Sequence, residues 1–558
     1  MCSDARRAGL ARAMAVAVAC LAPWLILQAE RRGPLFYADD PLLVDRDTEL
    51  DAGRFEEVEL SEAYDFLTNT FGSPGDRSRI RAVNVNTLDE VPDSSWFTNR
   101  IGVRDLPIAE VIRGPGKFER LDAGSWTIVR GKSPGGFQPG FRAVHPGDPD
   151  QVYQLEVDPP DYPQLATSAE LIGTLIYHAL GYHVVDVYTI RVDPRNISIS
   201  DKATIRDASG ERPFTRADLD AILRQGARDA SGRLYMSATR YEGEDVGNFE
   251  YHGTRADDPN DIHPHEHRRE LRANRVFAAW LAHDDSRAVN TRNLRFKEAG
   301  RAFVRHYMYD FGAILGSATR FAEPATNNHE YFIDKDRSLK NLWTLGLSVP
   351  PYLRGPIEGD VPRSVGRFES ATFDPDRWKP NYPNPAFSNM RPDDAFWGAR
   401  LVSRFSDGMI AAIVAQAGYD DPRAAPYLAR TLAERRDRIA RVWLNGVNPI
   451  VDPRLAADGT LTFANAAVQA GAATPATAYT IAWALYDNDA GTPGPASPGI
   501  RVTEPRVEAP AALLARATCV TATIRSEHPE HRAWAEPVRV YFRKEGDGWK
   551  TVGLFRGD

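Results

Sequence analysis

Cysteine and lysine are scarce in this 558-residue sequence. The three cysteines are Cys2, Cys20 and Cys519, and the first two lie within the first twenty residues. A fold stabilised by several disulfide bonds is therefore excluded, and hydrophobic cores must stabilise the chain. Lysine supplies nine of the 68 basic residues, so a lysine beside a candidate site is informative.

Long apolar runs are missing beyond the amino-terminus. Three arginines precede the apolar stretch Ala13–Ala29, a pattern typical of a secretory signal peptide or an N-terminal membrane anchor. We therefore expect residues 1–32 to direct export to the periplasm or cell envelope, with membrane association only through this segment. The residues around Cys20 loosely resemble a lipoprotein box, so a lipid anchor there is an alternative.

A basic surface is also missing. The formal net charge is −8, and no basic stripe with interleaved aromatic residues occurs, so a nucleic-acid partner is excluded. The hydrophobic fraction of 42% and the charged fraction of 26% are ordinary for globular proteins. At this length, two or three domains are expected.

The pattern of the first half predicts a small α+β lobe. Residues 33–124 are an N-terminal extension of mixed character, with a short helix near 61–70 and an irregular loop around Trp96. Alternating segments then predict three antiparallel strands at 125–130, 137–144 and 152–158. A helical pattern predicts a helix at 165–182, and a further strand is predicted at 184–192. We place this lobe at residues 125–195.

The second half predicts a helical lobe and a β domain. Apolar residues with a helical period mark a long helix over 265–282, and further helices follow within residues 196–449. From residue 450 to 558 the composition shifts to alanine, threonine, proline and glycine with alternating segments, which predicts a β-sandwich-like domain.

Three polar residues that follow the long predicted helix have a spacing that suits phosphoryl transfer. Asp285 and Asn290 are five residues apart, and Asp310 follows two short predicted strands in the sequence Asp-Phe-Gly. In phosphoryl transfer an aspartate orients the attacking hydroxyl, while an asparagine and a second aspartate hold Mg²⁺. The simplest alternative is that Asp284 and Asp285 end the helix in solvent.

A glycine-rich turn and an acidic helix residue lie upstream. The turn contains Gly131, Lys132, Gly135 and Gly136, and Glu170 lies on the helix that follows. In this order the motifs resemble the atypical protein-kinase-like superfamily, with HipA-like, CotH-like spore-coat and secretory-pathway kinases closest. The stretches "TSAELIGTLIYHALGY", "HDDSRAVN" and "YDFG" carry the resemblance, over about residues 125–320. The chain also resembles a group of exported bacterial proteins.

The resemblance implies a two-lobed kinase-like fold and a set of site residues. Asp285 would be the catalytic residue, Asn290 and Asp310 the metal ligands, and the glycine-rich turn and Glu170 part of the nucleotide site. Mg²⁺ or Mn²⁺ and ATP are the implied cofactors. The implied reaction is phosphoryl or nucleotidyl transfer to an unknown protein or small-molecule acceptor.

The sequence departs from the kinase pattern at one position. Where a lysine is expected on the third strand, the chain has Glu156, and Lys132 in the turn is the only lysine between residues 118 and 201. One hypothesis is that Lys132 or Arg142 supplies the missing cation while Glu156 and Glu170 hold a second divalent ion. The other is that the site is degenerate.

Two other functions remain open. Because the bacterial envelope outside the inner membrane lacks an ATP pool, a catalytically inactive kinase-like binding module is the main alternative. A metal-dependent hydrolase is the other, since His263, His265 and His267 precede His283 by about one helix. Spacing of two residues at a helix start points these side chains in different directions, so capping and pairing with neighbours is the simpler expectation.

Overall fold

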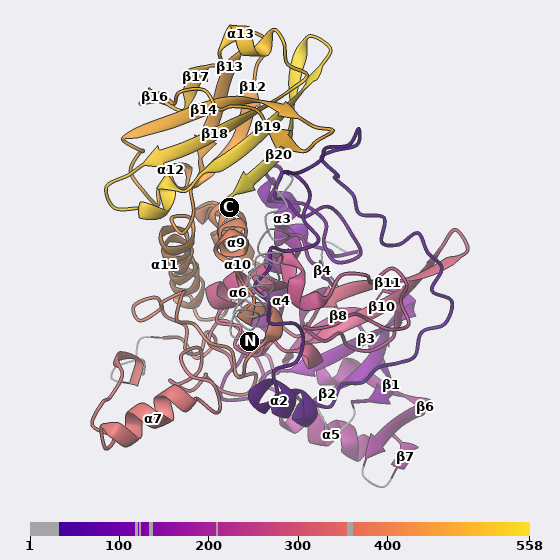
Figure 1. Ribbon diagram of the computed structural model, residues 1–558. Coiled ribbons are helices and arrows are strands. Elements are labelled where there is room, and N and C mark those ends of the chain that lie inside the picture. Colours follow the sequence, from indigo (N-terminus) through magenta and orange to yellow (C-terminus); the bar gives the residue numbers. More distant parts are fainter. Residues whose placement is uncertain are drawn as a thin grey trace, which may run out of the picture.

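The protein is a mixed α+β structure. The computed structural model describes residues 33–117, 121, 124–132, 138–207, 210–240, 242–353 and 361–557, so the expected leader lies outside the described part. Helices and several β-sheets alternate along the chain, which confirms the predicted α+β class. A large sheet lies beside a helical body, and the C-terminal sheets lie at one end of that body (Figure 1).

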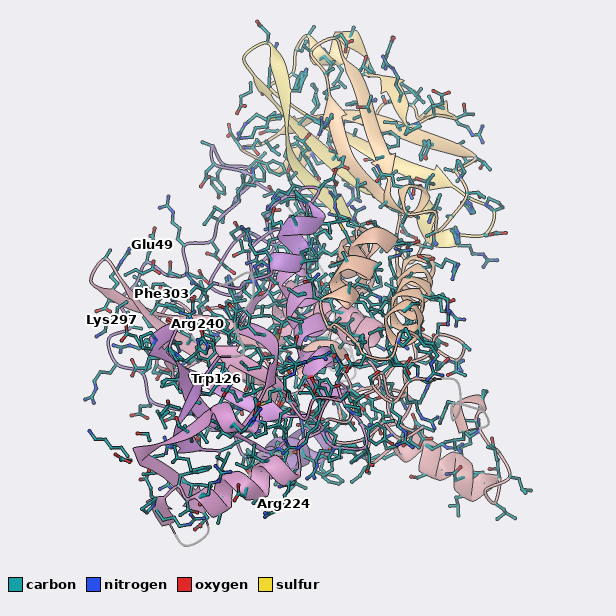
Figure 2. All side chains as sticks on the ribbon, turned by 180° about the vertical axis from the view of Figure 1, so that it is seen from behind. Glu49, Trp126, Arg224, Arg240, Lys297 and Phe303 are labelled. Atoms are coloured by element: carbon teal, nitrogen blue, oxygen red, sulfur yellow. The ribbon has the colours of Figure 1, made fainter. Side chains whose placement is uncertain are left out.

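The largest sheet has seven strands in the order β5-β8-β3-β2-β1-β6-β7, antiparallel except for the pair β1 and β6. The strands are β1 (Trp126–Gly131), β2 (Gly140–His145), β3 (Asp148–Val157), β5 (Asp186–Val192), β6 (Ile197–Asp207), β7 (Gly210–Pro213) and β8 (Leu234–Arg240). Trp126 is fully buried in the core of this sheet, and α5 (Arg216–Arg224) packs on the same core (Figure 2). The three antiparallel strands predicted between residues 125 and 158 are β1, β2 and β3.

Helix α4 (Ala166–Leu180) packs against β5 and β8, and all its residues except His178 are buried. It ends before Gly181, whose φ of 129° suits glycine, two residues before the end of the predicted helix at 182. The sheet continues past residue 195, where we expected the helical lobe to begin. Strand β8 lies between β3 and β5, so residues 197–240 complete the sheet instead of belonging to the helical body.

The helical body surrounds α6 (Arg269–Leu281), which contacts α8, α9 and α11. The other helices outside the C-terminal region are α2 (Glu62–Phe71), α3 (Ile108–Arg113), α7 (Lys335–Trp343), α8 (Pro385–Ser388), α9 (Pro392–Ser403), α10 (Asp407–Ala415) and α11 (Ala424–Trp443). Beside this body, a four-stranded sheet has the order β4-β11-β10-β9. Its strands are β4 (His183–Val184), β9 (Glu244–Asp245), β10 (Thr291–Glu298) and β11 (Arg301–Met308).

Two sheets form the C-terminal region, as the alternating pattern from residue 450 predicted. One contains β12 (Ile450–Leu455), β13 (Thr460–Asn465) and β17 (Arg506–Glu508). The other contains β14 (Ala478–Asp487), β15 (Thr492–Pro493), β16 (Ile500–Val502), β18 (Cys519–Glu527), β19 (Val538–Glu545) and β20 (Gly548–Arg556). Short helices α12 (Ala466–Gln469) and α13 (Ala511–Leu514) accompany them. One hydrophobic cluster joins this region to α11.

The N-terminal extension spans the length of the molecule (Figure 1). Phe36 packs between Tyr486 and Tyr541 of the C-terminal sheet. Farther along, the N–H of Ala52 donates to the carbonyl of Ala302 on β11 at 2.9 Å. The extension then forms α2 and continues into the helical body, so it contacts the C-terminal sheet, the four-stranded sheet and the helices.

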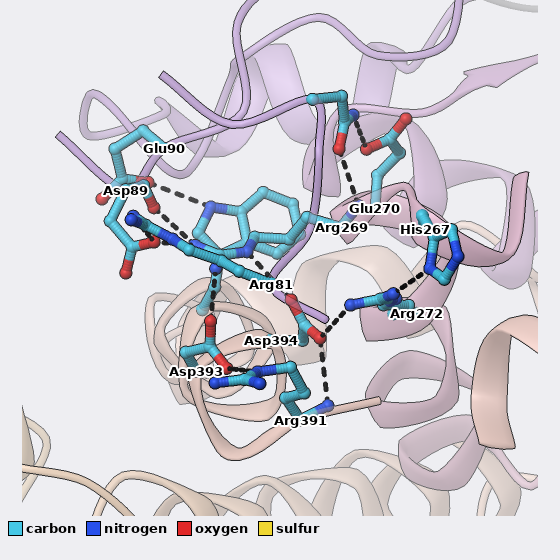
Figure 3. Close-up of polar contacts among 12 residues, drawn as sticks. Arg81, Asp89, Glu90, His267, Arg269, Glu270, Arg272, Arg391, Asp393 and Asp394 are labelled. Atoms are coloured by element: carbon cyan, nitrogen blue, oxygen red, sulfur yellow. Dashed lines mark hydrogen bonds and ion pairs between the residues drawn. The ribbon is translucent and has the colours of Figure 1, made fainter. Parts of the chain in front are cut away.

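A buried ionic network fixes the extension to the helices (Figure 3). Arg269 on α6 is fully buried and lies 2.8 Å from Asp89, 2.9 Å from Asp393 and 3.1 Å from Asp394. Arg556 at the end of β20 lies 3.6 Å from the same Asp89. Asp89 therefore connects the extension with α6 and with the C-terminal sheet.

Within the described residues, no helix has the length and apolar character that crossing a membrane requires.

Candidate functional site

The loop that contains Asp285 begins where α6 ends. Ala282 adopts a left-handed conformation with φ of 55°, and the N–H of His283 donates to the carbonyl of Ala278 at 2.8 Å. The chain thereby turns away from the helix, and a short 3₁₀ turn at Ala288–Asn290 leads into β10. Since α6 is buried along almost its whole length, the loop has a fixed origin.

The five-residue spacing brings Asp285 and Asn290 into contact. The Nδ2 group of Asn290 donates to Oδ2 of Asp285 at 2.8 Å and to its backbone carbonyl at 2.9 Å. The other carboxylate oxygen, Oδ1, pairs with Arg287 and accepts from Nδ2 of Asn381 at 3.3 Å. The Asp285 side chain is 15% exposed.

The hairpin of β10 and β11 returns the chain to this loop. The two strands pair from Thr291 with Met308 to Glu298 with Arg301. Beyond the hairpin, the N–H of Tyr309 donates to the carbonyl of Asn290 at 3.3 Å. The Asp285 loop and the Asp310-Phe311-Gly312 turn therefore lie side by side.

Asp310 is the exposed member of this site and has a φ of 62°, an unusual backbone conformation for a residue with a side chain. The charge of Asp310 contributes to the pKa of Asp285. Burial raises the pKa of Asp285, Arg287 opposes the rise and Asp310 adds to it. The two carboxylates thus interact electrostatically.

Glu170 on α4 lies beside the same turn. A Cβ atom built on Gly312 would lie 3.7 Å from Oε2 of Glu170 and 3.6 Å from Oδ1 of Asp310. The side chain of Glu170 is buried, and burial together with the charges of Asp310 and Glu156 raises its pKa well above the ordinary value. Asp310 and Glu156, from different parts of the chain, are therefore both within electrostatic reach of Glu170.

Gly173 allows the turn to approach α4 closely, and sequence reasoning missed it. A Cβ atom at Gly173 would lie 2.5 Å from Cβ of Phe311, so only glycine fits. Phe311 is buried there, with its ring centroid 4.6 Å from that of Tyr177. The signal in the sequence was a glycine inside a helix three residues after Glu170.

Lys132 reaches Glu156 across the sheet. Its Nζ group pairs with Oε1 of Glu156 and donates to the carbonyl of Gln138 at 3.0 Å, while Gln154 donates to the same carboxylate oxygen at 2.8 Å. Lys132 therefore lies beside Glu156, the position where the resemblance led us to expect a lysine. Gly135 and Gly136 lie outside the described residues.

Gly131 and Arg142 have other roles in the structure. Gly131 ends β1 against Ile205, where a Cβ atom would lie 2.7 Å from that side chain. This packing gives Gly131 a structural reason to be glycine. Arg142 is exposed on β2, in register with Gln154.

Asp284 is not part of a solvated helix end, because its side chain is almost completely buried. Burial and the neighbouring Asp285 raise its pKa to about 8. It interacts electrostatically with Glu323, a second buried carboxyl, whose Oε2 accepts from Asn328 at 2.6 Å. Glu323 was missed, since nothing in the local sequence marks it as close to the Asp285 loop.

Two of the histidines that suggested a metal-dependent hydrolase, His265 and His267, contact different aspartates. Nε2 of His265 lies 2.7 Å from Asp261, and Nε2 of His267 lies 3.0 Å from Asp76. The expected pairing with neighbours is thereby observed. In the part of the chain that the structure describes, no three histidine, cysteine, aspartate or glutamate side chains form a group that could hold a metal ion.

No protein-family model matches this chain, and no curated protein and no solved structure matches it.

Proposed function

We propose that the chain is a protein-kinase-like phosphotransferase that moves the γ-phosphoryl group of ATP to an acceptor hydroxyl. One observation carries the proposal: the loop with Asp285 and Asn290 and the turn with Asp310 are joined by the hydrogen bond between Tyr309 and Asn290. Glu170 on α4 lies beside the same turn. Phosphoryl transfer depends on positioning and charge neutralisation, and these are the groups that it needs.

The arrangement of elements supports the two-lobed part of the proposal. The seven-stranded sheet with α4 would form the nucleotide lobe, and the body around α6 would form the helical lobe. The proposed site lies where α4, the loop after α6 and the turn after β11 meet. In protein kinases the corresponding glutamate is also on a helix beside the sheet, and the catalytic loop also follows a helix.

In this proposal Asp285 orients the acceptor hydroxyl and accepts its proton. Burial raises its pKa, which makes the carboxylate a better base, and the amide of Asn290 fixes its orientation. In this proposal the Lys132 ammonium group would leave Glu156 and bind the phosphates. Lys132 and Glu156 form an ion pair in the seven-stranded sheet.

The residues fit a magnesium site that is completed by the nucleotide. Asn290 and Asp310 would hold Mg²⁺, which neutralises phosphate charge when bound. The amide nitrogen of Asn290 is used by Asp285, so its oxygen is the atom left for a cation. Mg²⁺ is commonly bound by one or two carboxylates together with water and substrate phosphates, so a cage of three acidic side chains is not required. Burial, and after it the charges of Asp310 and Glu156, raise the pKa of Glu170, and a cation bound nearby would oppose this rise.

A catalytically inactive binding module is the second candidate. Two contacts favour it: Lys132 is already paired with Glu156, and Arg287 is already paired with Asp285. Both pairs would have to open before these side chains could act on a substrate. In this case the kinase-like fold would present a surface to partners.

A thermal-shift assay with Mg²⁺ and ATP tests the proposal. We expect ATP at a hundred times its Kd to stabilise the protein by about 2.7 kcal/mol in the presence of Mg²⁺. Lys132→Ala should reduce this shift, because it removes the cation beside Glu156. Lys202→Ala, at an exposed position on β6, is the matched control and should behave as the unaltered chain does. Absence of a shift in all three proteins would contradict nucleotide binding.

A further inference from the structure

Helix α7 and the turn after it carry the most exposed apolar side chains of the described chain. Leu342, Trp343, Leu345 and Leu347 are 72%, 84%, 84% and 83% exposed, more than any other large apolar residue in the described ranges. Leu339, at 55%, lies one turn before Trp343 on the same side of the helix. We call these five residues the α7 face. Contiguous exposed apolar surface of this kind marks an interaction site.

Contacts made by the polar residues of α7 leave the α7 face directed toward solvent. Asp334 caps the helix by accepting from the N–H of Arg337 at 3.0 Å, and Lys379 pairs with the same carboxylate. Arg337 pairs with Glu330 at 3.2 Å and donates to the carbonyl of Ser348 at 3.2 Å. These contacts bind α7 to the body through its polar residues and leave the apolar ones outside. In both views the helix projects from the body (Figures 1 and 2).

The charge of this segment differs from that of the whole chain. Residues 335–353 contain three basic side chains and one acidic one, whereas the chain has a net charge of −8. Lys335 and Lys340 are exposed and border the α7 face, and they are two of only nine lysines. A short helix with tryptophan and leucine on one side and lysines at its border has the composition of a helix that lies in a membrane interface.

We propose that the α7 face docks onto an anionic lipid surface. Trp343 and the leucines would enter the boundary between headgroups and acyl chains, where indole rings are favoured, while Lys335 and Lys340 would lie among the anionic headgroups. The helix has nine residues, so it lies on a bilayer and does not cross one. The docking is additional to the N-terminal segment, through which alone we expected membrane association. It does not depend on the proposed phosphotransfer.

Hydrogen–deuterium exchange of the full chain tests this docking locally, so that binding through the N-terminal segment does not obscure it. The probe is vesicles of phosphatidylglycerol and phosphatidylcholine in equal amounts. We expect exchange of the amides of residues 335–349 to slow at least tenfold with these vesicles and much less with phosphatidylcholine alone. The double variant Leu342→Ser and Trp343→Ser should lose this protection. Both side chains are exposed, so the variant should remain folded.

The matched control replaces two exposed apolar residues elsewhere. Leu43 and Ile262 are 68% and 69% exposed, and the double variant Leu43→Ser and Ile262→Ser should keep the full protection. Protection that is absent with anionic vesicles, or that persists in the α7 variant, overturns the proposal. Protection that rises with protein concentration without vesicles also overturns it, because the face would then bind a second copy of the chain.

Discussion

Asp285→Asn should reduce ATP turnover by about 10²–10⁴-fold, the usual contribution of a positioned general base. Asparagine has nearly the same shape, so the contacts to Asn290 and Asn381 can be kept in part and the protein should remain folded. What is lost is the negative charge that orients the acceptor hydroxyl and takes up its proton. Formation of ADP from ATP, with circular dichroism as the check of folding, measures the effect.

A matched control separates this chemistry from a general effect of removing an acidic residue. Asp201 lies exposed on β6, and Asp201→Asn should turn over ATP as the unaltered chain does. If Asp285→Asn and the control have equal turnover, Asp285 is not the catalytic residue. If no protein of the set has turnover while ATP still binds, the inactive binding module is the better description.

Arg269→Met should destabilise the protein by about 3–5 kcal/mol, which is typical when one partner of a buried ionic group is removed. The guanidinium is fully buried among Asp89, Asp393 and Asp394. Without it, Asp89 would keep Arg81 and Asp394 would keep Arg272, but the central cation between the carboxylates would be missing. The extension would lose the ion pair that attaches Asp89 to α6. The shift of the urea midpoint, followed by tryptophan fluorescence, measures the loss.

Arg195→Met is the matched control for this variant. Arg195 forms an ion pair with Asp193 in solvent, with 88% of its side chain exposed. Its removal should change the free energy of unfolding by less than about 0.5 kcal/mol. Equal effects of the two substitutions would show that the buried network does not hold the extension in place.

The fold could be predicted where one local period dominates. More and less buried residues alternate along most of β1, and α4 has a continuous helical pattern, so the positions of these elements follow from the residues themselves. The extension of the sheet by β6 and β8 could not be predicted in this way. β8 pairs with β3 and β5, which precede it by dozens of residues, and no local pattern specifies partners at that distance.

The local contact of the candidate site could be predicted from the sequence, but the contacts between residues far apart in the chain could not. A spacing of five residues is local, so the contact between Asp285 and Asn290 followed from the sequence. Other contacts depend on tertiary packing. Arg287 pairs with Glu62, 225 residues away on α2. Burial, and after it the charge of Asp284, raise the pKa of Glu323. Lys132 was recognised because lysine is scarce, but its pairing with Glu156 needed the register of the sheet.

The position of a manganese ion bound together with a non-hydrolysable ATP analogue is the most direct measurement of the proposed function. Anomalous scattering from a crystal of the full chain would locate the ion. The proposal predicts a peak within about 2.0–2.5 Å of Oδ1 of Asn290 and of a carboxylate oxygen of Asp310, with the phosphates on the same ion. A peak elsewhere, or an analogue bound away from Asp285, would contradict the assignment of the site.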